Sequence, residues 1–179
     1  MKLIFITGNK GKFEEAKAII PDLEQSDIDL VEIQSIDSKE VITHKLEEAR
    51  KMVTGSFAVE DNSLYLEALN GLPGPLIKWF LKTIGNDGLY KLAESFNNFN
   101  ASAKVVIGLS KEDRTTEFFE GEIKGKIVSP RGENGFGWDA IFEIEGTGKT
   151  FAEMTQEEKN EISMRKIAFQ KLKGYLESK

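Results

Sequence analysis

The feature that most constrains the fold lies at the start of the chain, where a short apolar run breaks into a polar loop. Met1–Ile6 has the composition of a strand, and Thr7-Gly-Asn-Lys-Gly-Lys12 follows it directly. The next stretch, Phe13–Ile20, has the pattern of a helix. Glycines let a ligand approach the backbone, N–H groups are exposed where a helix begins, and ammonium groups neutralise charge. The segment therefore indicates an anion site at a strand-to-helix turn.

This loop differs from the two best-known phosphate motifs. Gly8 and Gly11 are only three residues apart and Phe13 follows Lys12, so the loop of P-loop nucleoside triphosphatases is not matched. The dinucleotide fingerprint is also absent, because its second glycine is missing. A plain strand-to-helix turn with solvated lysines would explain the same residues. Phosphate binding is thus one of two interpretations of this segment.

Composition limits the classes of protein that fit. The chain has 179 residues, enough for one core that buries roughly 70% of the unfolded surface. We expect a single domain over residues 1–179, folded in two lobes. A net charge of −6 argues against a nucleic-acid-binding face, so a polyanion must be met by a local group of bases. The lack of cysteine excludes disulfides and thiolate chemistry.

The N-terminal apolar run, Leu3–Ile6, is far too short to span a bilayer, and no other stretch approaches the required length. The sequence therefore predicts a soluble, cytoplasmic protein that does not associate with membranes.

Apolar periodicity predicts strands and helices that alternate along the chain. A capping box, Thr155-Gln-Glu-Glu158, opens a helical tail that Ser163 can divide. Leu64–Leu69 is ambiguous between strand and helix. The other expected helices are 41–53, Leu76–Ile84 and Asp87–Phe96, and the expected strands are Ile28–Gln34, Phe57–Asp61, Ser102–Ser110, Thr115–Glu120, one within Glu122–Val128, and Ala140–Ile144. This order predicts an α/β fold.

A pair of carboxylates stands at the predicted end of a strand, in Val59-Glu-Asp-Asn-Ser-Leu64. Strand ends are where α/β folds place their sites, and adjacent carboxylates suit a hard cation such as Mg²⁺. A strand-to-loop turn capped by Asp or Asn is the alternative.

Three further clusters carry candidate ligands. Gly71-Leu-Pro-Gly-Pro-Leu-Ile-Lys-Trp-Phe80 brings Lys78 to the first turn of a helix, beside aromatic residues more typical of a core. Arg131-Gly-Glu-Asn-Gly-Phe-Gly-Trp-Asp139 can stack a base and present amides to its edge, or can simply anchor a loop. Glu157–Arg165 is either a set of site bases or a solvated helix face. His44, the only histidine, gives no argument for a metal site.

Together these clusters resemble the inosine triphosphate pyrophosphatase family, over nearly the whole chain. The carriers, in family order, are Thr7-Gly-Asn-x-x-Lys12, Val59-Glu-Asp-x-x-Leu64, Gly71-Leu-Pro-Gly-Pro-x-Ile-Lys-Trp-Phe80, Phe136-Gly-Trp-Asp139, Phe151-Ala-Glu-Met154 and Glu158-Lys-Asn160. The resemblance implies a mixed, twisted central sheet with flanking helices, and two lobes around a substrate cleft. It also implies Mg²⁺-dependent hydrolysis of non-canonical purine nucleoside triphosphates to the monophosphate and pyrophosphate, and commonly a homodimer.

The same resemblance assigns roles to individual residues. Asp61 corresponds to the acid that binds the metal and activates water, and Glu32 to the metal-binding glutamate, with Glu60 a weaker metal candidate. The implied substrate-binding residues are Thr7, Gly8, Asn9, Lys10, Lys12, Lys45, Asn62, Ser63, Lys78, Phe136, Gly137, Trp138, Asp139, Lys159 and Arg165.

The chain departs from the family pattern in the tail, where the family has Ser-His-Arg and this sequence has Ser163-Met-Arg165. Methionine cannot donate a hydrogen bond, so reading of the purine's keto oxygen would rest on Arg165 and on loop amides. Two other functions fit the residues less well. They are a pyrophosphatase acting on pyrimidine or modified nucleotides, and a nucleotide-binding module without catalysis.

Overall fold

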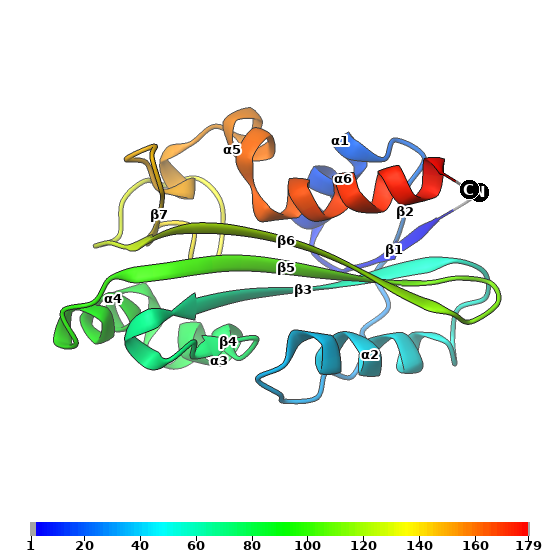
Figure 1. The fold of residues 1–179 in the computed structure, drawn as a ribbon, viewed down its shortest axis with the longest axis horizontal. Coiled ribbons are helices and arrows are strands. Elements are labelled where there is room, and N and C mark those ends of the chain that lie inside the picture. Colours follow the sequence, from blue (N-terminus) through cyan, green and yellow to red (C-terminus); the bar gives the residue numbers. More distant parts are fainter. Residues whose placement is uncertain (1–2, 179) are drawn as a thin grey trace. The chain divides into compact units, whose positions relative to one another are not determined.

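The computed structural model describes residues 3–178, in which strands and helices alternate (Figure 1). In chain order the elements, with η for 3₁₀ helices, are β1 (Ile4–Ile6), α1 (Lys10–Ile19), β2 (Glu24–Ser26), α2 (Ser38–Ala49), β3 (Phe57–Leu66), η1 (Glu67–Leu69), β4 (Pro73–Gly74), α3 (Ile77–Thr83), α4 (Gly85–Ser95), β5 (Asn100–Ser110), β6 (Thr116–Ile127), β7 (Phe142–Ile144), η2 (Phe151–Glu153), α5 (Gln156–Ile162) and α6 (Met164–Glu177).

The strands form a mixed sheet in the order β2-β1-β3-β5-β6-β7, with β4 paired to β3. β1 pairs in parallel with β2 and with β3, whereas β4 is antiparallel to β3 and β7 to β6. Parallel neighbours need crossover connections, which usually contain a helix. α1 lies in the connection from β1 to β2, and α2 in that from β2 to β3. The predicted α/β class, with a mixed sheet and flanking helices, is confirmed.

The second strand is shorter and earlier than the sequence predicts. β2 pairs with β1 from Ile4 opposite Glu24 to Ile6 opposite Ser26, and the N–H of Thr7 donates to the Ser26 carbonyl at 2.8 Å. β1 ends at Ile6, so residues after Ser26 find no described strand with which to form backbone hydrogen bonds. The prediction of a strand at Ile28–Gln34 is therefore wrong. Two of its apolar residues pack against a core cluster from an irregular segment.

Other elements differ from the prediction only in length. β3 continues through Leu66, which resolves part of the ambiguous stretch as strand. β6 runs unbroken from Thr116 to Ile127, where the sequence suggested two strands. α2 begins after Asp37, whose carboxylate accepts from the N–H of Lys39 at 2.8 Å, and it ends at Ala49.

By their contacts the described residues divide into two compact units. Unit 1 contains residues 3–62, 105–121 and 164–178, and unit 2 contains residues 63–104 and 122–163. Residues of β3, β5 and β6 belong to both units. The expectation of one domain with two lobes stays a prediction.

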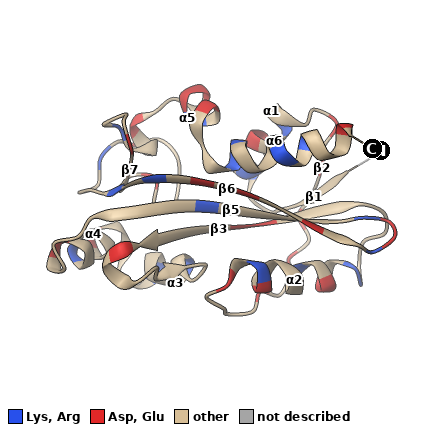
Figure 2. Cartoon of the chain, viewed as in Figure 1, with Lys and Arg blue, Asp and Glu red and all other residues tan. Residues whose placement is uncertain are grey.

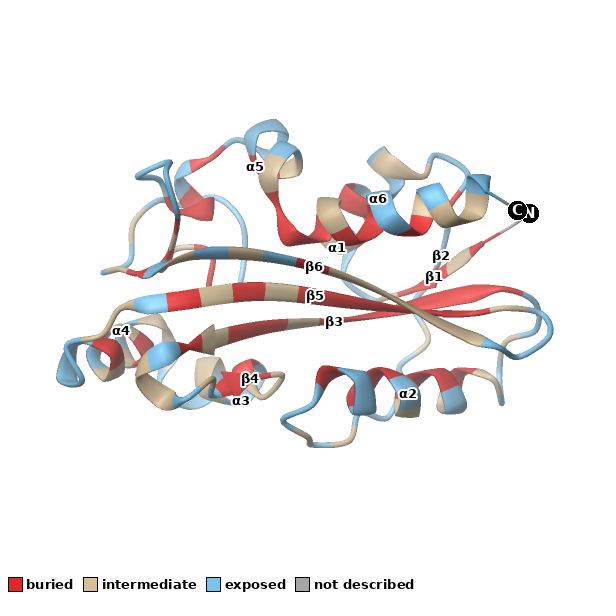
Figure 3. Ribbon diagram, viewed as in Figure 1, coloured by how far each residue is buried: buried red, intermediate tan, exposed pale blue. Residues whose placement is uncertain are grey.

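Unit 1 carries helices on both faces of its strands (Figure 1). α2 packs through Ile42 and Leu46 onto Phe57 and Val59. α1 and α6 pack together on the other face, where the rings of Phe5 and Phe169 meet edge-to-face, 5.2 Å apart. The buried residues of α2 lie on the side that faces the strands (Figure 3). Helices and strands thus bury their apolar sides against each other in three layers within this unit.

Unit 2 contains the α3–α4 pair and an aromatic core in which Trp138 contacts Phe142 and Phe151. A capping box begins η2, and the predicted box from Thr155 to Glu158 begins α5. α5 ends at Ile162, and the extended residue Ser163 separates it from α6, as the sequence predicts. In the part of the chain that the structure describes, no helix has both the length and the apolar character of a transmembrane span.

Candidate active site

The loop after β1 forms the N-terminal cap of α1. The Asn9 side-chain oxygen accepts from the N–H of Lys12 at 3.1 Å, and the Thr7 hydroxyl accepts from the N–H of Asn9 at 3.2 Å. Asparagine is a preferred N-cap because its side chain satisfies an amide that has no partner within the helix. Gly8, Asn9 and Lys10 are exposed, and a Cβ at Gly8 would meet no atom within 4 Å. The capping leaves the Asn9 side-chain NH₂ as its donor toward an anion.

A buried group of charges lies under this helix in unit 1. Glu60 on β3 accepts from the Nε and Nη2 of Arg165, both at 3.0 Å, and its Oε1 lies 2.9 Å from the Nζ of Lys12. The third nitrogen of Arg165, Nη1, pairs with the carboxylate of Glu15 on α1. We call Lys12, Glu15, Glu60 and Arg165 the charge cluster. Three of its members are nearly inaccessible to solvent, and Lys12 is half-buried.

The electrostatics of the charge cluster keep Glu60 ionised. Burial alone would raise the pKa of the Glu60 carboxyl, but the charges and hydrogen bonds of Arg165 and Lys12 outweigh burial and lower that pKa to about 2. Burial likewise opposes the charge on Arg165, whereas Glu60 and Glu15 raise the pKa of its guanidinium above the ordinary value. Glu60 and Arg165 are therefore both charged at neutral pH.

The carboxylates of Glu60 and Asp61 point to opposite faces of β3, since successive side chains alternate along a strand. Glu60 meets α1 and α6, whereas Phe57 and Val59 pack on α2, so Asp61 lies on the α2 face. Glu60 is saturated by its cationic partners. Glu60 is thus already paired with two cations, and its weaker assignment to the metal stays a prediction.

Lys45 on α2 joins Glu32 to the main chain of β3. Its Nζ lies 2.5 Å from the carboxylate of Glu32 and donates to the main-chain carbonyl of Glu60 at 3.0 Å. Glu32 is thus held beside the peptide that joins Glu60 to Asp61. Within residues 3–178 no group of three or more acids or histidines gathers closely enough to enclose a metal. The carboxylates of Glu32 and Asp61 are nevertheless suitable ligands for Mg²⁺, because this ion keeps several waters and takes its other ligands from substrate phosphates.

Lys78 and the Pro-Gly loop belong to unit 2. Lys78 is exposed on the first turn of α3, and no described residue pairs with it. Trp79, expected in the core, is about half exposed. Ser63 is fully buried in β3, and the side-chain oxygen of Asn62 is buried without a hydrogen-bond partner among the described residues. That buried acceptor is open to a donor from outside the chain.

The loop Gly135–Asp139, here called the aromatic loop, is held by an ion pair in unit 2. The Asp139 carboxylate accepts from the N–H of Phe136 at 2.9 Å and from the Nζ of Lys159 at 2.7 Å. The same Nζ lies 4.7 Å from the centre of the Phe136 ring. Asp139 and Lys159 are buried, whereas Phe136 is 36% exposed. The loop thus offers one accessible ring, held beside a buried cation.

Two predicted base-contacting side chains are placed differently from expectation. The Trp138 ring is only 4% exposed and packs in the unit 2 core, which rules out stacking on a base and leaves its main chain as a possible contact. Arg165 is buried in unit 1 with all three nitrogens bound to carboxylates. Its base-reading role stays a prediction. Met164, where the family has histidine, is buried in unit 1 and occupies an apolar position.

Sequence reasoning missed two residues of these clusters. Glu15 is buried in α1 as the second partner of Arg165, and Asn86 on α4 donates from Nδ2 to the Gly137 carbonyl at 3.0 Å. Neither has a local signal, because their partners lie 150 and 51 residues away in sequence.

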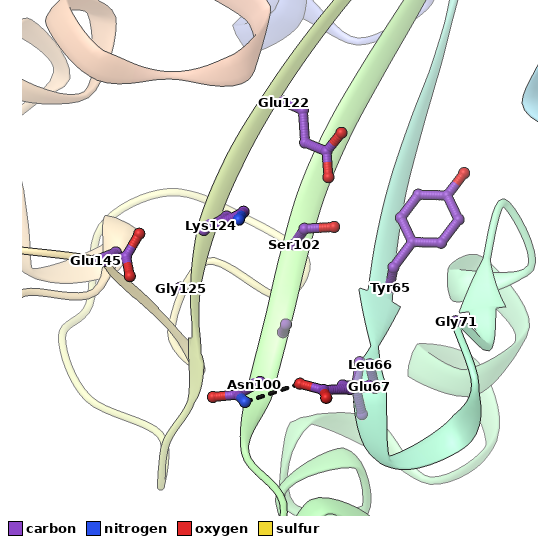
Figure 4. A pocket seen from close by; sticks show the side chains of 11 residues that line it. Tyr65, Leu66, Glu67, Gly71, Asn100, Ser102, Glu122, Lys124, Gly125 and Glu145 are labelled. Atoms are coloured by element: carbon purple, nitrogen blue, oxygen red, sulfur yellow. Dashed lines mark hydrogen bonds between the residues drawn. The ribbon is translucent and has the colours of Figure 1, made fainter.

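A separate pocket of about 440 Å³ lies on the strands of unit 2 (Figure 4). Tyr65, Ser102 and Glu122 line it, and so do Asn100 and Glu67, where the Asn100 side chain donates to the Glu67 carboxylate at 2.7 Å. None of the predicted substrate-binding residues lines this pocket. Acidic and basic residues are interspersed along α2, whereas the charged residues of α6 are basic up to Lys173, with one acid, Glu177, at its end (Figure 2).

The sequence profile of the Ham1 family matches residues 3–175. The chain belongs to the Ham1 family. Among curated relatives, an inosine triphosphate pyrophosphatase of Schizosaccharomyces pombe is 44% identical over 180 residues, covering 98% of this chain and 95% of the relative. Inosine triphosphate pyrophosphatase 2 of Trypanosoma cruzi is 43% identical and covers 97% and 91%.

Solved structures of Ham1 proteins agree with the fold. The Ham1 protein of Staphylococcus aureus superposes with a TM-score of 0.86 at 31% identity, over 99% of each chain. That of Coxiella burnetii gives 0.85 at 27% identity, over 100% of each chain. Membership of the Ham1 family confirms the resemblance drawn from the motifs.

Proposed function

We propose that this chain hydrolyses non-canonical purine nucleoside triphosphates (ITP, dITP and XTP) to the monophosphate and pyrophosphate. The observation that carries the proposal is similarity over the full length, at 38–44% identity, to relatives named inosine triphosphate pyrophosphatase. A Ham1-fold protein of Mycobacterium abscessus is named a dITP/XTP pyrophosphatase. Removal of such nucleotides from the pool is the corresponding role.

In this proposal the lysines and the start of α1 bind the triphosphate. A triphosphate carries roughly four negative charges, so an acidic protein needs several local cations to bind it. Lys12, Lys45 and Lys78 supply ammonium groups, and Asn9 supplies its NH₂. Thr7, Gly8 and Lys10 complete the loop. Lys12 is aimed by its bond to the ionised Glu60, which keeps this cation in place before a nucleotide arrives.

The chemistry proposed is attack of water on the α-phosphorus, with pyrophosphate as leaving group. Asp61 orients the water and accepts its proton. Glu32 and Asp61 would hold Mg²⁺, which supplies charge neutralisation at the phosphate oxygens when bound. Lys45 holds Glu32 next to the Glu60–Asp61 peptide. No covalent intermediate on the protein is required.

The base is bound in this proposal by the aromatic loop, together with Lys159. Phe136 stacks on the purine, and main-chain groups of Gly137 and Trp138 face its edge. Asp139 fixes the loop through its two bonds. Hydrogen-bond donors that point at the keto oxygen of the base stay unpaired when adenine places an amino group there. This mismatch should lower kcat/KM for ATP relative to ITP. Asn62, Ser63 and Arg165 remain predicted contacts of the nucleotide, which mutagenesis can test.

One experiment separates this function from its alternatives. The protein is incubated with ITP, XTP, dITP, GTP, ATP and UTP, with and without Mg²⁺, and pyrophosphate is assayed separately from phosphate. We expect Mg²⁺-dependent pyrophosphate release with ITP and XTP ahead of ATP. Release of single phosphates, or equal turnover of ATP, would contradict the proposal.

The carboxylate assignment has its own test. Asp61→Asn removes the proton acceptor while keeping the shape of the side chain, so kcat should fall by roughly 100-fold or more. Most of the activity surviving at saturating Mg²⁺ would show that Asp61 is not the acid that activates water.

We also propose that the protein forms a homodimer, as the family resemblance implies. Sedimentation equilibrium should give a mass close to twice 20.1 kDa.

A further inference from the structure

Asn86 holds one peptide of the aromatic loop from outside the loop. Its Nδ2 donates to the Gly137 carbonyl at 3.0 Å, which joins the first turn of α4 to the loop. Its own side-chain oxygen is buried and has no hydrogen-bond partner within residues 3–178. A buried acceptor left without a partner costs roughly 1–3 kcal/mol. Of the two ends of this amide, only Nδ2 has a partner among the described residues, and that partner is the Gly137 carbonyl.

On its glycine side, the peptide that Asn86 holds has little local packing to fix it. Gly137 has φ +64, in the left-handed region that glycine enters at little cost. A Cβ at this position would meet only Leu81, at 3.8 Å, so packing does little to fix the local backbone. The buried Trp138 ring anchors the far side of the Gly137–Trp138 peptide, and the hydrogen bond from Asn86 restrains its carbonyl.

Fixing the carbonyl also fixes the next amide. The peptide is trans, so the Trp138 N–H points opposite to the Gly137 carbonyl, away from Asn86. No described residue accepts a hydrogen bond from this N–H. Two other amides of the loop are already used inside it: that of Phe136 donates to the Asp139 carboxylate, and that of Asp139 to the Phe136 carbonyl.

We propose that Asn86 is a positioning residue for base recognition, which aims the Trp138 N–H at an acceptor on the edge of the base. A keto oxygen accepts such a bond, whereas the amino group of adenine at the same position does not. Asn86 touches no substrate and acts through the peptide it holds. The inference rests on the proposed function, because it requires that the aromatic loop bind the base.

The test compares Asn86→Asp with a control, Asn97→Asp. The Asn86→Asp side chain would keep the shape of asparagine but would present a carboxylate oxygen to the Gly137 carbonyl, so the bond is replaced by repulsion. An acidic residue is favourable in the first turn of a helix, so α4 should remain intact. Asn97 is exposed in the same unit, and its side chain makes no hydrogen bond with a described residue. Asn86→Ala serves as a second variant that removes the bond without adding a charge.

Binding is measured by calorimetry in EDTA for ITP, ATP and inorganic triphosphate. Loss of a neutral hydrogen bond should weaken ITP binding by about 3- to 10-fold. Binding of inorganic triphosphate should be unchanged, and the preference for ITP over ATP should shrink by the same factor as ITP binding. Under turnover conditions KM for ITP rises while kcat stays within about twofold.

Unchanged ITP binding in both Asn86 variants would overturn the inference. Equal weakening of ITP and inorganic triphosphate would overturn it too, because that pattern reports general damage to the protein. These measurements need no turnover. If the wild-type protein bound ITP but released no pyrophosphate, the proposed function would be contradicted. The binding comparison of the Asn86 variants would still decide the inference about Asn86.

Discussion

Neutralising Glu60 tests whether the charge cluster stabilises unit 1 through its ionised carboxylate. Glutamine has nearly the shape of a protonated glutamate, so Glu60→Gln imitates the uncharged state. Arg165 would keep Glu15 and one acceptor at residue 60, but it would lose the charge opposite its Nε and Nη2. Lys12 would lose its ion-pair partner at 2.9 Å. The substitution leaves two buried or half-buried cations with less negative charge around them.

The magnitude follows from the pKa of Glu60, which falls from its ordinary 4.5 to about 2 in the folded protein. That difference corresponds to about 3 kcal/mol of stability. Because the folded pKa is the lower one, the contribution is complete above pH 4.5 and is lost as the pH falls toward 2. The stability gap between wild type and variant should be about 3 kcal/mol at pH 7 and roughly 1 kcal/mol at pH 3.

The assay is urea unfolding of both proteins in EDTA across this pH range, which removes any contribution of a metal. Glu47→Gln on the exposed face of α2 is the control, and it should leave stability within about 0.5 kcal/mol of wild type. A gap that does not change between pH 3 and pH 7 would refute the electrostatic reasoning. A gap under about 1 kcal/mol at pH 7 would refute the assigned magnitude.

Two further predictions concern phosphate binding and packing. Lys12→Met should raise KM for ITP by about 10-fold or more, because a charged hydrogen bond is worth roughly 1.5–3 kcal/mol. Lys10→Met changes an exposed residue and should raise KM less. Steady-state kinetics of both variants measure this difference, and an equal rise in KM would contradict the prediction. Gly121→Ala should lower the free energy of unfolding by about 3 kcal/mol, since its Cβ would lie 1.9 Å from the Met164 carbonyl oxygen. A Cβ at Gly174 would meet no atom within 4 Å, so Gly174→Ala should leave the free energy of unfolding unchanged or raise it in the same denaturation assay.

Much of the fold could be predicted from the sequence, because its signals are local. The capping box at Thr155, the helix break at Ser163 and the two helices around Gly85 each depend on a few neighbouring residues. Ile28–Gln34 shows the limit of such signals. Its alternation satisfies the pattern of a strand, but a strand also needs a partner with free backbone groups. β1 ends at Ile6, and that length is set by the turn into α1 rather than by anything in the segment itself.

The candidate site was predictable as a set of residue types and not as a set of contacts. The motifs supplied Lys12, Glu60, Asp139 and Lys159, and the structure pairs them within their units. Glu15 and Asn86 were missed because pairing across a long stretch of chain leaves no mark in composition or spacing. For a related reason, the sequence did not show which part of Trp138 is accessible. An aromatic residue beside glycines fits a binding loop and a core anchor equally well until its burial is known.

The two adjacent acids show how the fold divides roles that the sequence cannot separate. Glu60 and Asp61 have the same chemistry and adjoining positions, and a pair of carboxylates invites assignment to one metal. Alternation along β3 sends them to opposite faces, where Glu60 meets Arg165 and Lys12. A carboxylate whose pKa lies near 2 is a poor proton acceptor at neutral pH, because its protonated form is strongly disfavoured. This supports the proposal that Asp61, rather than Glu60, takes the proton from water, while Glu60 holds Lys12 through their ion pair.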